Sequence, residues 1–128
     1  YNIYRLSIYK GGFFMAIDKS LLTGSTSMLL LKLLEEKDMY GYMMIEELSK
    51  KSDNTFSLKA GTLYPLLHTL EEKNFVTSYD KISDTGRQRK YYSITKKRKH
   101  HLKEKKEEWQ QYTSAVNKVL KGGMTFAY

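Results

Sequence analysis

Two short stretches of the sequence carry side chains suited to binding a polyanion. Lysine and arginine neutralise phosphate groups, whereas threonine, histidine and glutamine also form hydrogen bonds with the edges of bases. The residues concerned are Lys59, Thr62 and His68 in the first stretch and Arg87, Gln88, Arg89 and Lys90 in the second. Their types predict reversible binding of nucleic acid.

Each of these residues also has a simpler interpretation. Thr62 stands near the expected start of a helix, where a threonine side chain can cap the first backbone N–H groups. Tyr64 is a further candidate for nucleic-acid contact, but a phenol at that place more often packs in the core. The cations of the second stretch can form a solvated turn, but their clustering favours contact. The sequence leaves these alternatives open.

Catalysis and metal binding have little support in the sequence. The chain has no cysteine, which excludes a disulfide scaffold, a thiol nucleophile and a thiolate zinc site. His100 and His101 are adjacent, so their side chains point about 100° apart on a helix and form a poor ligand pair. We therefore expect no enzyme activity, no cofactor and no metal.

The composition is that of an ordinary globular protein with a basic balance. The chain has 128 residues, of which 41% are hydrophobic, and a net charge of +8. This length suits one domain, and the charge favours DNA, RNA or an anionic membrane surface. No apolar run approaches the roughly 20 residues of a membrane helix. We expect a cytoplasmic location, which the lack of cysteine fits.

The hydrophobic pattern predicts three helices, a hairpin and a last helix. The ranges with helical periodicity are 19–36, 41–52, 60–73 and about 97–121. The ranges that resemble strands are 75–79 and 89–95, joined through the polar turn Ser83–Gly86. Residues 38–41 are expected to form a turn. The predicted fold class is mainly α with a small β-hairpin, in the order of a winged helix-turn-helix with a C-terminal dimerisation helix.

The helix at 60–73 is the clearest of these predictions. Its leucines repeat on one face and are Leu63, Leu66, Leu67 and Leu70. Pro65 is expected in the first turn, where its missing N–H costs little, and Asn74 is a suitable left-handed cap. The face opposite the leucines carries Thr62 and His68, and the major groove of DNA is wide enough to admit it.

The last helix carries a seam of apolar residues at the spacing of a coiled coil. The seam consists of Leu102, Trp109, Tyr112, Val116 and Val119. Lys105 interrupts it near its start, and its flanks are rich in lysine and glutamate. The pattern predicts that these residues form a homodimer interface.

Three segments resemble the PadR family of bacterial transcriptional regulators, within a similarity that spans residues 21–120. They are Tyr40–Tyr42, Gly61–Val76 and Gly86–Thr95. The resemblance implies a homodimer that binds double-stranded DNA at a near-palindromic operator and represses transcription until a ligand or stress signal releases it. By the same resemblance, Tyr40 and Tyr64 join the expected DNA-binding residues.

With only one helix after the hairpin, the chain resembles the short branch of that family, including its multidrug-sensing members. Some short members bind flat, aromatic and often cationic drugs against a tryptophan of the last helix, and Trp109 stands at the similar place. The resemblance implies that Ser27, Met28 and Leu31 line the same effector pocket. Packing in a dimer core is the alternative role of Trp109.

A tryptophan pair across a two-fold axis forms a slot for planar guests, and cations gain from the ring quadrupole. Glu107 and Glu108 are expected to add attraction for a cation. One position departs from the family: it commonly has glycine three residues after the last threonine of the hairpin, where this chain has Arg98. Arginine favours a helix where glycine permits a bend.

The organisation follows from these elements. We assign residues 15–95 to the winged-helix domain, 96–121 to the dimerisation helix, and 122–128 to a flexible tail. Residues 1–14 are expected to be a non-native leader or a disordered extension, because Met15 opens a stretch that resembles a natural start. Two rival functions stay open, a winged helix for protein–protein contact and a nucleic-acid-binding protein without a ligand. The basic hairpin favours nucleic acid.

Overall fold

The structure is a computed structural model that describes residues 6–9, 12–15 and 19–122, with side chains from residue 25 onward. Strands β1 (Leu6–Tyr9) and β2 (Gly12–Met15) pair in an antiparallel hairpin with Leu6 opposite Met15. The native or non-native origin of residues 1–14 stays a prediction. The predicted tail lies outside the described residues, apart from Gly122. Gly122 directly follows the last helix and has a φ of +62°.

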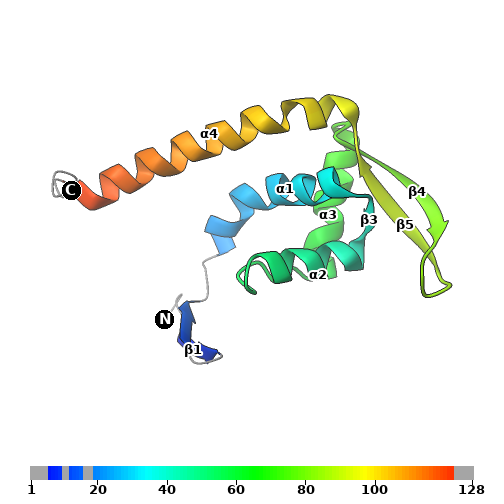
Figure 1. The fold of residues 1–128 in the computed structure, drawn as a ribbon, viewed down its shortest axis with the longest axis horizontal. Coiled ribbons are helices and arrows are strands. Elements are labelled where there is room, and N and C mark those ends of the chain that lie inside the picture. Colours follow the sequence, from blue (N-terminus) through cyan, green and yellow to red (C-terminus); the bar gives the residue numbers. More distant parts are fainter. Residues whose placement is uncertain (1–5, 10–11, 16–18, 123–128) are drawn as a thin grey trace.

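Four helices make up most of the fold. They are α1 (Lys19–Glu36), α2 (Gly41–Lys51), α3 (Ala60–Glu72) and α4 (Lys96–Lys121). Helices α1, α2 and α3 lie together with the first turns of α4, and the rest of α4 projects away from them (Figure 1). The predicted helices are therefore confirmed, with ends that differ by single residues. None of the described helices is both long and apolar enough to span a membrane.

The sheet contains a strand that the sequence did not predict. Its order is β3 (Met39–Tyr40), β5 (Gln88–Ile94) and β4 (Val76–Ile82), all antiparallel. The predicted turn at residues 38–41 is therefore wrong, because Met39 pairs with Tyr92 and Tyr40 with Tyr91. Two residues are too few to show an alternating pattern, and their partner strand lies much later in the chain. The predicted hairpin is confirmed, although β4 extends further than expected.

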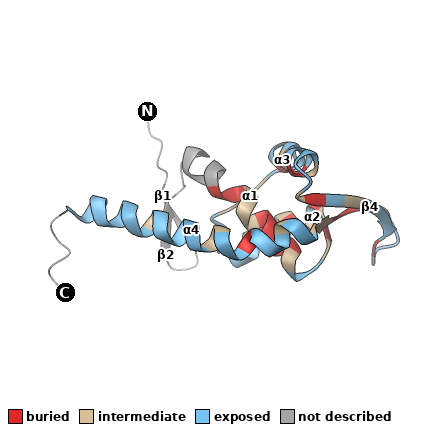
Figure 2. Ribbon diagram, turned by 90° about the horizontal axis from the view of Figure 1, so that it is seen from above, coloured by how far each residue is buried: buried red, intermediate tan, exposed pale blue. Residues whose placement is uncertain are grey.

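The core lies where α1, α2, α3, the start of α4 and one face of the sheet meet (Figure 2). Helix α1 supplies leucines from several of its sides, as expected for a helix that is apolar nearly all round. The core residues of the helices are Leu30, Leu31, Leu33, Leu34, Met44, Leu48, Leu63, Leu67, Leu70 and Leu102. Of the predicted α3 stripe, Leu66 alone is only half-buried, and it packs against this core.

The end of α3 has the geometry that the sequence predicts. Asn74 adopts a left-handed φ of +62°. Its N–H donates to the Glu71 carbonyl at 3.0 Å, and the Phe75 N–H donates to the Leu70 carbonyl at 2.9 Å. This pair of bonds is a Schellman motif, which satisfies the last carbonyls of the helix and turns the chain into β4.

The position of Pro65 differs from the prediction. Helix α3 begins at Ala60, so Pro65 lies inside the helix rather than in its first turn. Because proline has no N–H, the Gly61 carbonyl lacks its regular helical donor. Both Gly61 and Pro65 are exposed, so water can serve that carbonyl instead.

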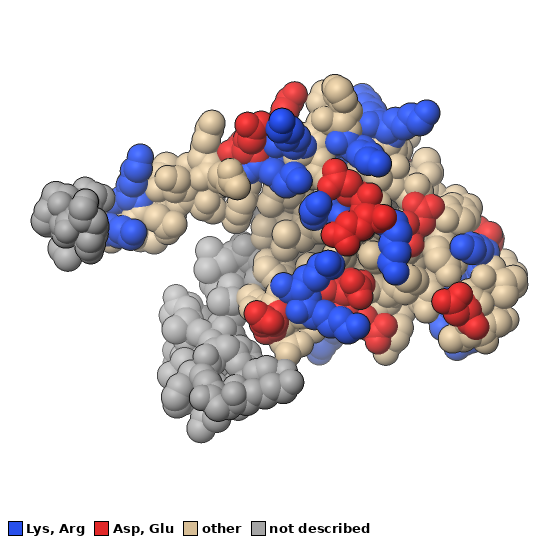
Figure 3. Space-filling model, viewed as in Figure 1, with Lys and Arg blue, Asp and Glu red and all other residues tan. Residues whose placement is uncertain are grey.

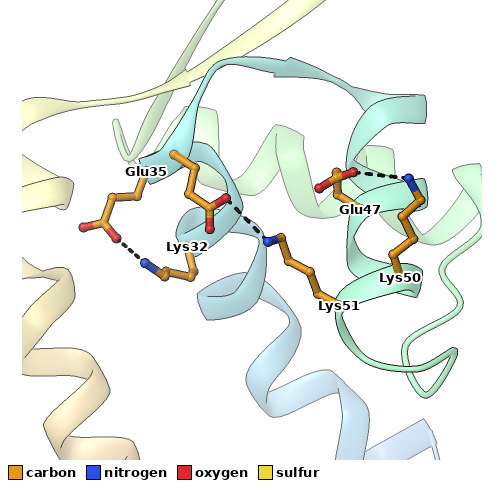
Figure 4. A network of polar contacts seen from close by, with 6 residues as sticks. Lys32, Glu35, Glu47, Lys50 and Lys51 are labelled. Atoms are coloured by element: carbon orange, nitrogen blue, oxygen red, sulfur yellow. Dashed lines mark hydrogen bonds and ion pairs between the residues drawn. The ribbon is translucent and has the colours of Figure 1, made fainter.

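One exposed ion pair connects α1 with α2, and further pairs form within each helix (Figure 4). Lys51 Nζ lies 3.6 Å from Glu36 Oε1 and joins the two helices. Within α1, Lys32 Nζ donates to Glu35 Oε1 at 2.9 Å, and this bond lowers the pKa of the Glu35 carboxyl and raises the pKa of Lys32. Such surface pairs stabilise a fold by about 0–1 kcal/mol each, so the buried leucines dominate.

Candidate nucleic-acid interface

The start of α3 exposes Lys59 and Thr62. Lys59 is the N-cap residue, in extended backbone geometry and without a side-chain cap. The Thr62 N–H donates to the Lys59 carbonyl at 2.9 Å, which places Thr62 inside the first turn. The interpretation of Thr62 as the capping residue is therefore wrong. Its exposed side chain stands beside a helix start whose N–H groups favour a phosphate.

The exposed face of α3 continues through Pro65 to His68. His68 Nε2 lies 3.5 Å from Glu72 Oε2, one turn further along, and both side chains are exposed. The Thr69 hydroxyl donates to the Pro65 carbonyl at 3.1 Å, so it serves the backbone. The α3 face available to a base or phosphate is thus Thr62, Pro65 and His68.

Tyr64 packs over the start of α2 and stays partly exposed. A Cβ atom placed on Gly41 would lie only 2.8 Å from Tyr64 Cζ and closer still to the hydroxyl. A side chain at position 41 would therefore displace the Tyr64 ring from its place over α2, which gives a reason for the glycine between Tyr40 and Tyr42. The interpretation of Tyr64 as a core residue is wrong, because 47% of the residue is exposed and it lies outside the core cluster, while its role in nucleic-acid contact stays a prediction.

Replacing Gly41 with alanine is expected to destabilise the protein by about 1–3 kcal/mol, because the added methyl overpacks the Tyr64 contact. Urea denaturation measures the change. The matched control is Gly61→Ala, since a Cβ there meets nothing within 4 Å. That change is expected to stabilise the helix by about 0.5–1 kcal/mol. If Gly41→Ala destabilises the protein equally in the presence of Tyr64→Ala, a contact other than that with Tyr64 is responsible.

The tip of the β4–β5 hairpin, the wing, is a well-defined turn. The Gly86 N–H donates to the Ser83 carbonyl at 2.9 Å, and the Ser83 N–H donates to the Arg87 carbonyl at 2.8 Å. Gly86 has a φ of +84°, which a side chain would disfavour. Arg87, Gln88 and Lys90 follow this turn and are exposed. The wing thus presents cations on a backbone of fixed shape.

Three tyrosines form a row across the sheet on the face opposite the core. Tyr40, Tyr91 and Tyr79 are direct cross-strand partners. The ring centroids of Tyr91 lie 5.3 Å from Tyr40 and 5.8 Å from Tyr79. The Tyr79 hydroxyl donates to Asp38 Oδ2 at 2.6 Å, and this bond raises the pKa of Tyr79 to about 12. Tyr79 therefore stays neutral, and its bond to Asp38 anchors the wing to the segment that follows α1.

Two wing cations lie over this row. The Arg89 guanidinium carbon is 4.9 Å from the Tyr40 ring centroid, and Lys81 Nζ is 5.1 Å from that of Tyr91. Arg89 is half-buried, whereas Arg87 and Lys90 are exposed. The structure thus brings Tyr40 and Arg89 together, and the Tyr40 ring holds the Arg89 guanidinium in place. Lys90 stays exposed although its Nζ lies 5.7 Å from the Tyr92 ring centroid, and Arg87 is exposed as well, so both can reach a phosphate.

The projecting part of α4 carries an apolar ridge, which we define as Tyr112, Ala115, Val116, Val119 and Leu120. These residues line one open hollow along the helix. Val119 is 79% exposed and Leu120 78% exposed within the single chain. On the face seen in Figure 3, this stretch is largely free of charge between the charged body of the fold and the lysines near the helix end. Exposed apolar surface of this kind marks an interaction site.

Leu102 does not belong to this ridge, and its assignment to the dimer interface is wrong. Its side chain has 0% exposure within the single chain and packs with Leu30 and Leu63 in the core. The reason is that the first turns of α4 lie on α1. The apolar residues of α4 keep one heptad spacing along the helix. Leu102, near its start, packs in the chain's own core, whereas the later members of the series are exposed to solvent.

A groove of about 500 Å³ lies between α1 and α4 and contains three of the four predicted effector-pocket residues, Ser27, Met28 and Trp109. The Trp109 and Tyr112 ring centroids are 5.9 Å apart along one side of it. Leu31 does not line the groove, and that assignment is wrong. It is fully buried in the core, because α1 turns its side chain inward.

The sequence-based prediction missed Arg98 and Lys105 as groove residues. Both line the groove together with Glu108 and Tyr112. Their spacing could have revealed them, since residues 98, 105, 109 and 112 fall on one helix face. Glu107, in contrast, lines a separate hollow on α4 with Gln110. Over residues 25–122, no three His, Cys, Asp or Glu side chains gather as metal ligands.

The order of three helices and a wing, with α3 packed on β4 and its polar face exposed, defines a winged helix-turn-helix DNA-binding regulator. The sequence profile of the transcriptional regulator PadR-like family matches residues 30–104. The chain belongs to this family. It is therefore a transcriptional regulator rather than an enzyme.

Individual relatives agree with this assignment. The chain is 34% identical over 107 residues to a protein of Lysinibacillus sphaericus, covering 83% of this chain and 97% of that protein. It is similar to a PadR-like transcriptional regulator from Bacillus cereus at 32% identity, with coverage of 81% and 99% and a TM-score of 0.70. A PadR family transcription regulator from Clostridium difficile is 36% identical, with coverage of 76% and 99% and a TM-score of 0.64.

Proposed function

We propose that this protein is a cytoplasmic, homodimeric repressor that binds a near-palindromic operator through α3 and the wing. The observation that carries the proposal is the exposed polar face of α3 next to a wing with exposed cations. A gel-shift with the DNA upstream of its own gene, together with a reporter placed behind that DNA, tests it. Repression that survives loss of DNA binding would contradict it.

The apolar ridge of α4 supports the homodimer. A second copy of the same ridge is the occupant proposed here, because a two-fold axis matches like with like and covers Val119 and Leu120 on both chains. A dimer also sets a fixed distance between two α3 helices, which is what two operator half-sites require. Helix α4, which carries the ridge, projects beyond the other helices (Figure 1).

The wing is proposed to contact the DNA backbone. Replacing Arg87 and Lys90 with alanine should weaken binding to all sequences and reduce the slope of log affinity against log salt by about one for each lost phosphate contact. Fluorescence anisotropy at several salt concentrations measures both quantities. The matched control is Lys121→Ala, which removes an exposed cation at the far end of α4. An equal fall in slope for the control would point to net charge rather than to the wing.

Arg89 is expected to behave differently from these two residues. Its guanidinium lies over Tyr40, so Tyr40→Ala should reduce DNA affinity through the lost position of Arg89. In a double-mutant cycle, Tyr40→Ala and Arg89→Ala should therefore be non-additive. Additive effects would show that Tyr40 contacts DNA on its own account.

The groove between α1 and α4 is proposed to bind a planar aromatic effector that releases the operator. Trp109 and Tyr112 offer ring faces for stacking. Trp109 is the single tryptophan of the chain, so its fluorescence reports on this place. Planar dyes of either charge should quench it and weaken the operator complex, whereas Trp109→Leu should abolish the effect on DNA. Release of DNA by the same dyes from the Trp109→Leu variant would place the effector elsewhere.

A further inference from the structure

Strand β4 is held from both faces at the point where it leaves the core. On the face toward the core, the Ser78 hydroxyl donates to Glu71 Oε2 of α3 at 2.7 Å. On the opposite face, the hydroxyl of the next residue, Tyr79, donates to Asp38 Oδ2 at 2.6 Å. Side chains alternate between the two faces of a strand, so these two bonds hold β4 from opposite sides and fix the direction in which the wing leaves the core.

The bond from Glu71 joins the wing directly to the helix whose exposed face is proposed to meet DNA. Glu71 is half-buried near the end of α3, about one turn beyond His68. Burial raises the pKa of Tyr92, and the negative charge of Glu71 raises it further. Tyr92 lies on β5 as the cross-strand partner of Ser78. The Glu71 carboxylate thus interacts with residues of both wing strands at this level.

The outer part of the wing has no such support. In the described part of the chain, residues 80–90 form no hydrogen bond or ion pair with a helix, and the hairpin extends away from the helices (Figure 1). The turn at Ser83 lies roughly 16 Å beyond Ser78 at the rise of an extended strand. A small rotation at Ser78 would therefore displace Arg87, at the tip, much more than the base of the wing.

We infer that Glu71 is a positioning residue for DNA binding, because its bond to Ser78 sets the angle between α3 and the wing and so lets α3 and Arg87 reach one duplex together. The inference rests on the proposed contact of the wing with the DNA backbone. A carboxylate near DNA repels the phosphates. Removing the charge of Glu71 alone should therefore favour binding, whereas removing its bond should weaken binding.

Two replacements of Glu71 separate the bond from the charge. Glu71→Gln and Glu71→Ala lose the same charge, but only glutamine keeps an acceptor for the Ser78 hydroxyl. With a labelled duplex from upstream of its own gene, Glu71→Gln should keep or raise the affinity of the full chain. Glu71→Ala should lower it by at least about fivefold and reduce the slope of log affinity against log salt, because wing contacts are lost. Fluorescence anisotropy at several salt concentrations measures both quantities.

Two further variants test the same bonds from the strand. Ser78→Ala removes the donor to Glu71 and should match Glu71→Ala in affinity and in salt slope. Tyr79→Phe removes only the hydroxyl on the opposite face and should change both quantities in the same direction. Urea denaturation checks that each variant is folded under the binding conditions. A folded Ser78→Ala variant with unchanged affinity and slope would overturn the inference.

A double-mutant cycle separates this inference from the proposed function. In the Arg87→Ala, Lys90→Ala background the wing cations are absent, so Glu71→Ala should cause no further loss of affinity. If Arg87→Ala with Lys90→Ala leaves affinity and slope unchanged, the proposed wing contact fails, and the role of Glu71 fails with it. If those cations matter but Glu71→Ala behaves like Glu71→Gln, or its loss is fully additive, the positioning role is overturned while the wing contact stands.

Discussion

Replacing Val119 and Leu120 with glutamate is expected to convert the dimer into monomers and to lower operator affinity by at least about 100-fold. The physical reason is that both side chains are exposed in the single chain and that the proposed second copy would bury them. A monomer binds one half-site and loses the gain from two linked contacts, which is typically a factor of about 10²–10⁴. Analytical ultracentrifugation and anisotropy with whole and half operators measure the two effects.

The matched control places the same charges on another face of the same helix. Ser114 and Asn117 are exposed and line a hollow apart from the apolar ridge. Ser114→Glu with Asn117→Glu should leave both the dimer and operator affinity near their original values. Affinity for an isolated half-site should be similar in all three proteins. A Val119→Glu, Leu120→Glu variant that stays dimeric would refute the ridge as the interface.

Leu102→Ala is expected to reduce the free energy of unfolding by about 2–5 kcal/mol. Leu102 is completely buried among residues of its own chain, so its truncation leaves a cavity where α4 lies on α1. Because a dimer unfolds with a concentration dependence, the measurement is best made in the monomeric Val119→Glu, Leu120→Glu background. Urea denaturation in that background reports on the core alone.

Val116→Ala is the control for this second prediction. Val116 shares the heptad spacing with Leu102 but lies on the exposed ridge. In the monomeric background its replacement should change stability by no more than about 0.5 kcal/mol, whereas in the dimer it should weaken association. If Leu102→Ala and Val116→Ala reduced the free energy of unfolding of the monomer equally, both side chains would be packed in the core of the single chain.

Much of the fold was predictable because its patterns are local. The leucines of α3, the Asn74 cap and the Gly86 turn are all set by residues a few positions apart, and local spacing determines which faces are apolar. The exposed polar face of α3 and the cationic wing were predictable for the same reason. The short strand β3 was not, because it depends on pairing with the distant strand β5.

The site residues show the same division. Of the residues predicted for an effector pocket, Trp109, Ser27 and Met28 line one groove, whereas Leu31 is buried in the core. A helix that is apolar nearly all round does not reveal which of its leucines face the core. Arg98 and Lys105 were missed as groove residues, because a cation on a lysine-rich helix is ordinarily exposed to solvent.

The sequence by itself determined that α3 has one buried and one polar face, that the wing is basic, and that α4 carries an apolar seam, because residue type and spacing suffice for each. Only the tertiary structure decided which residues of that seam pack in the core and which remain exposed. Packing of α4 on α1 buries Leu102, leaves Val119 and Leu120 open, and places Arg98 beside Trp109. These outcomes depend on how α1 and α4, which are far apart in the chain, pack on each other. The periodicity of residues along one helix does not determine that packing.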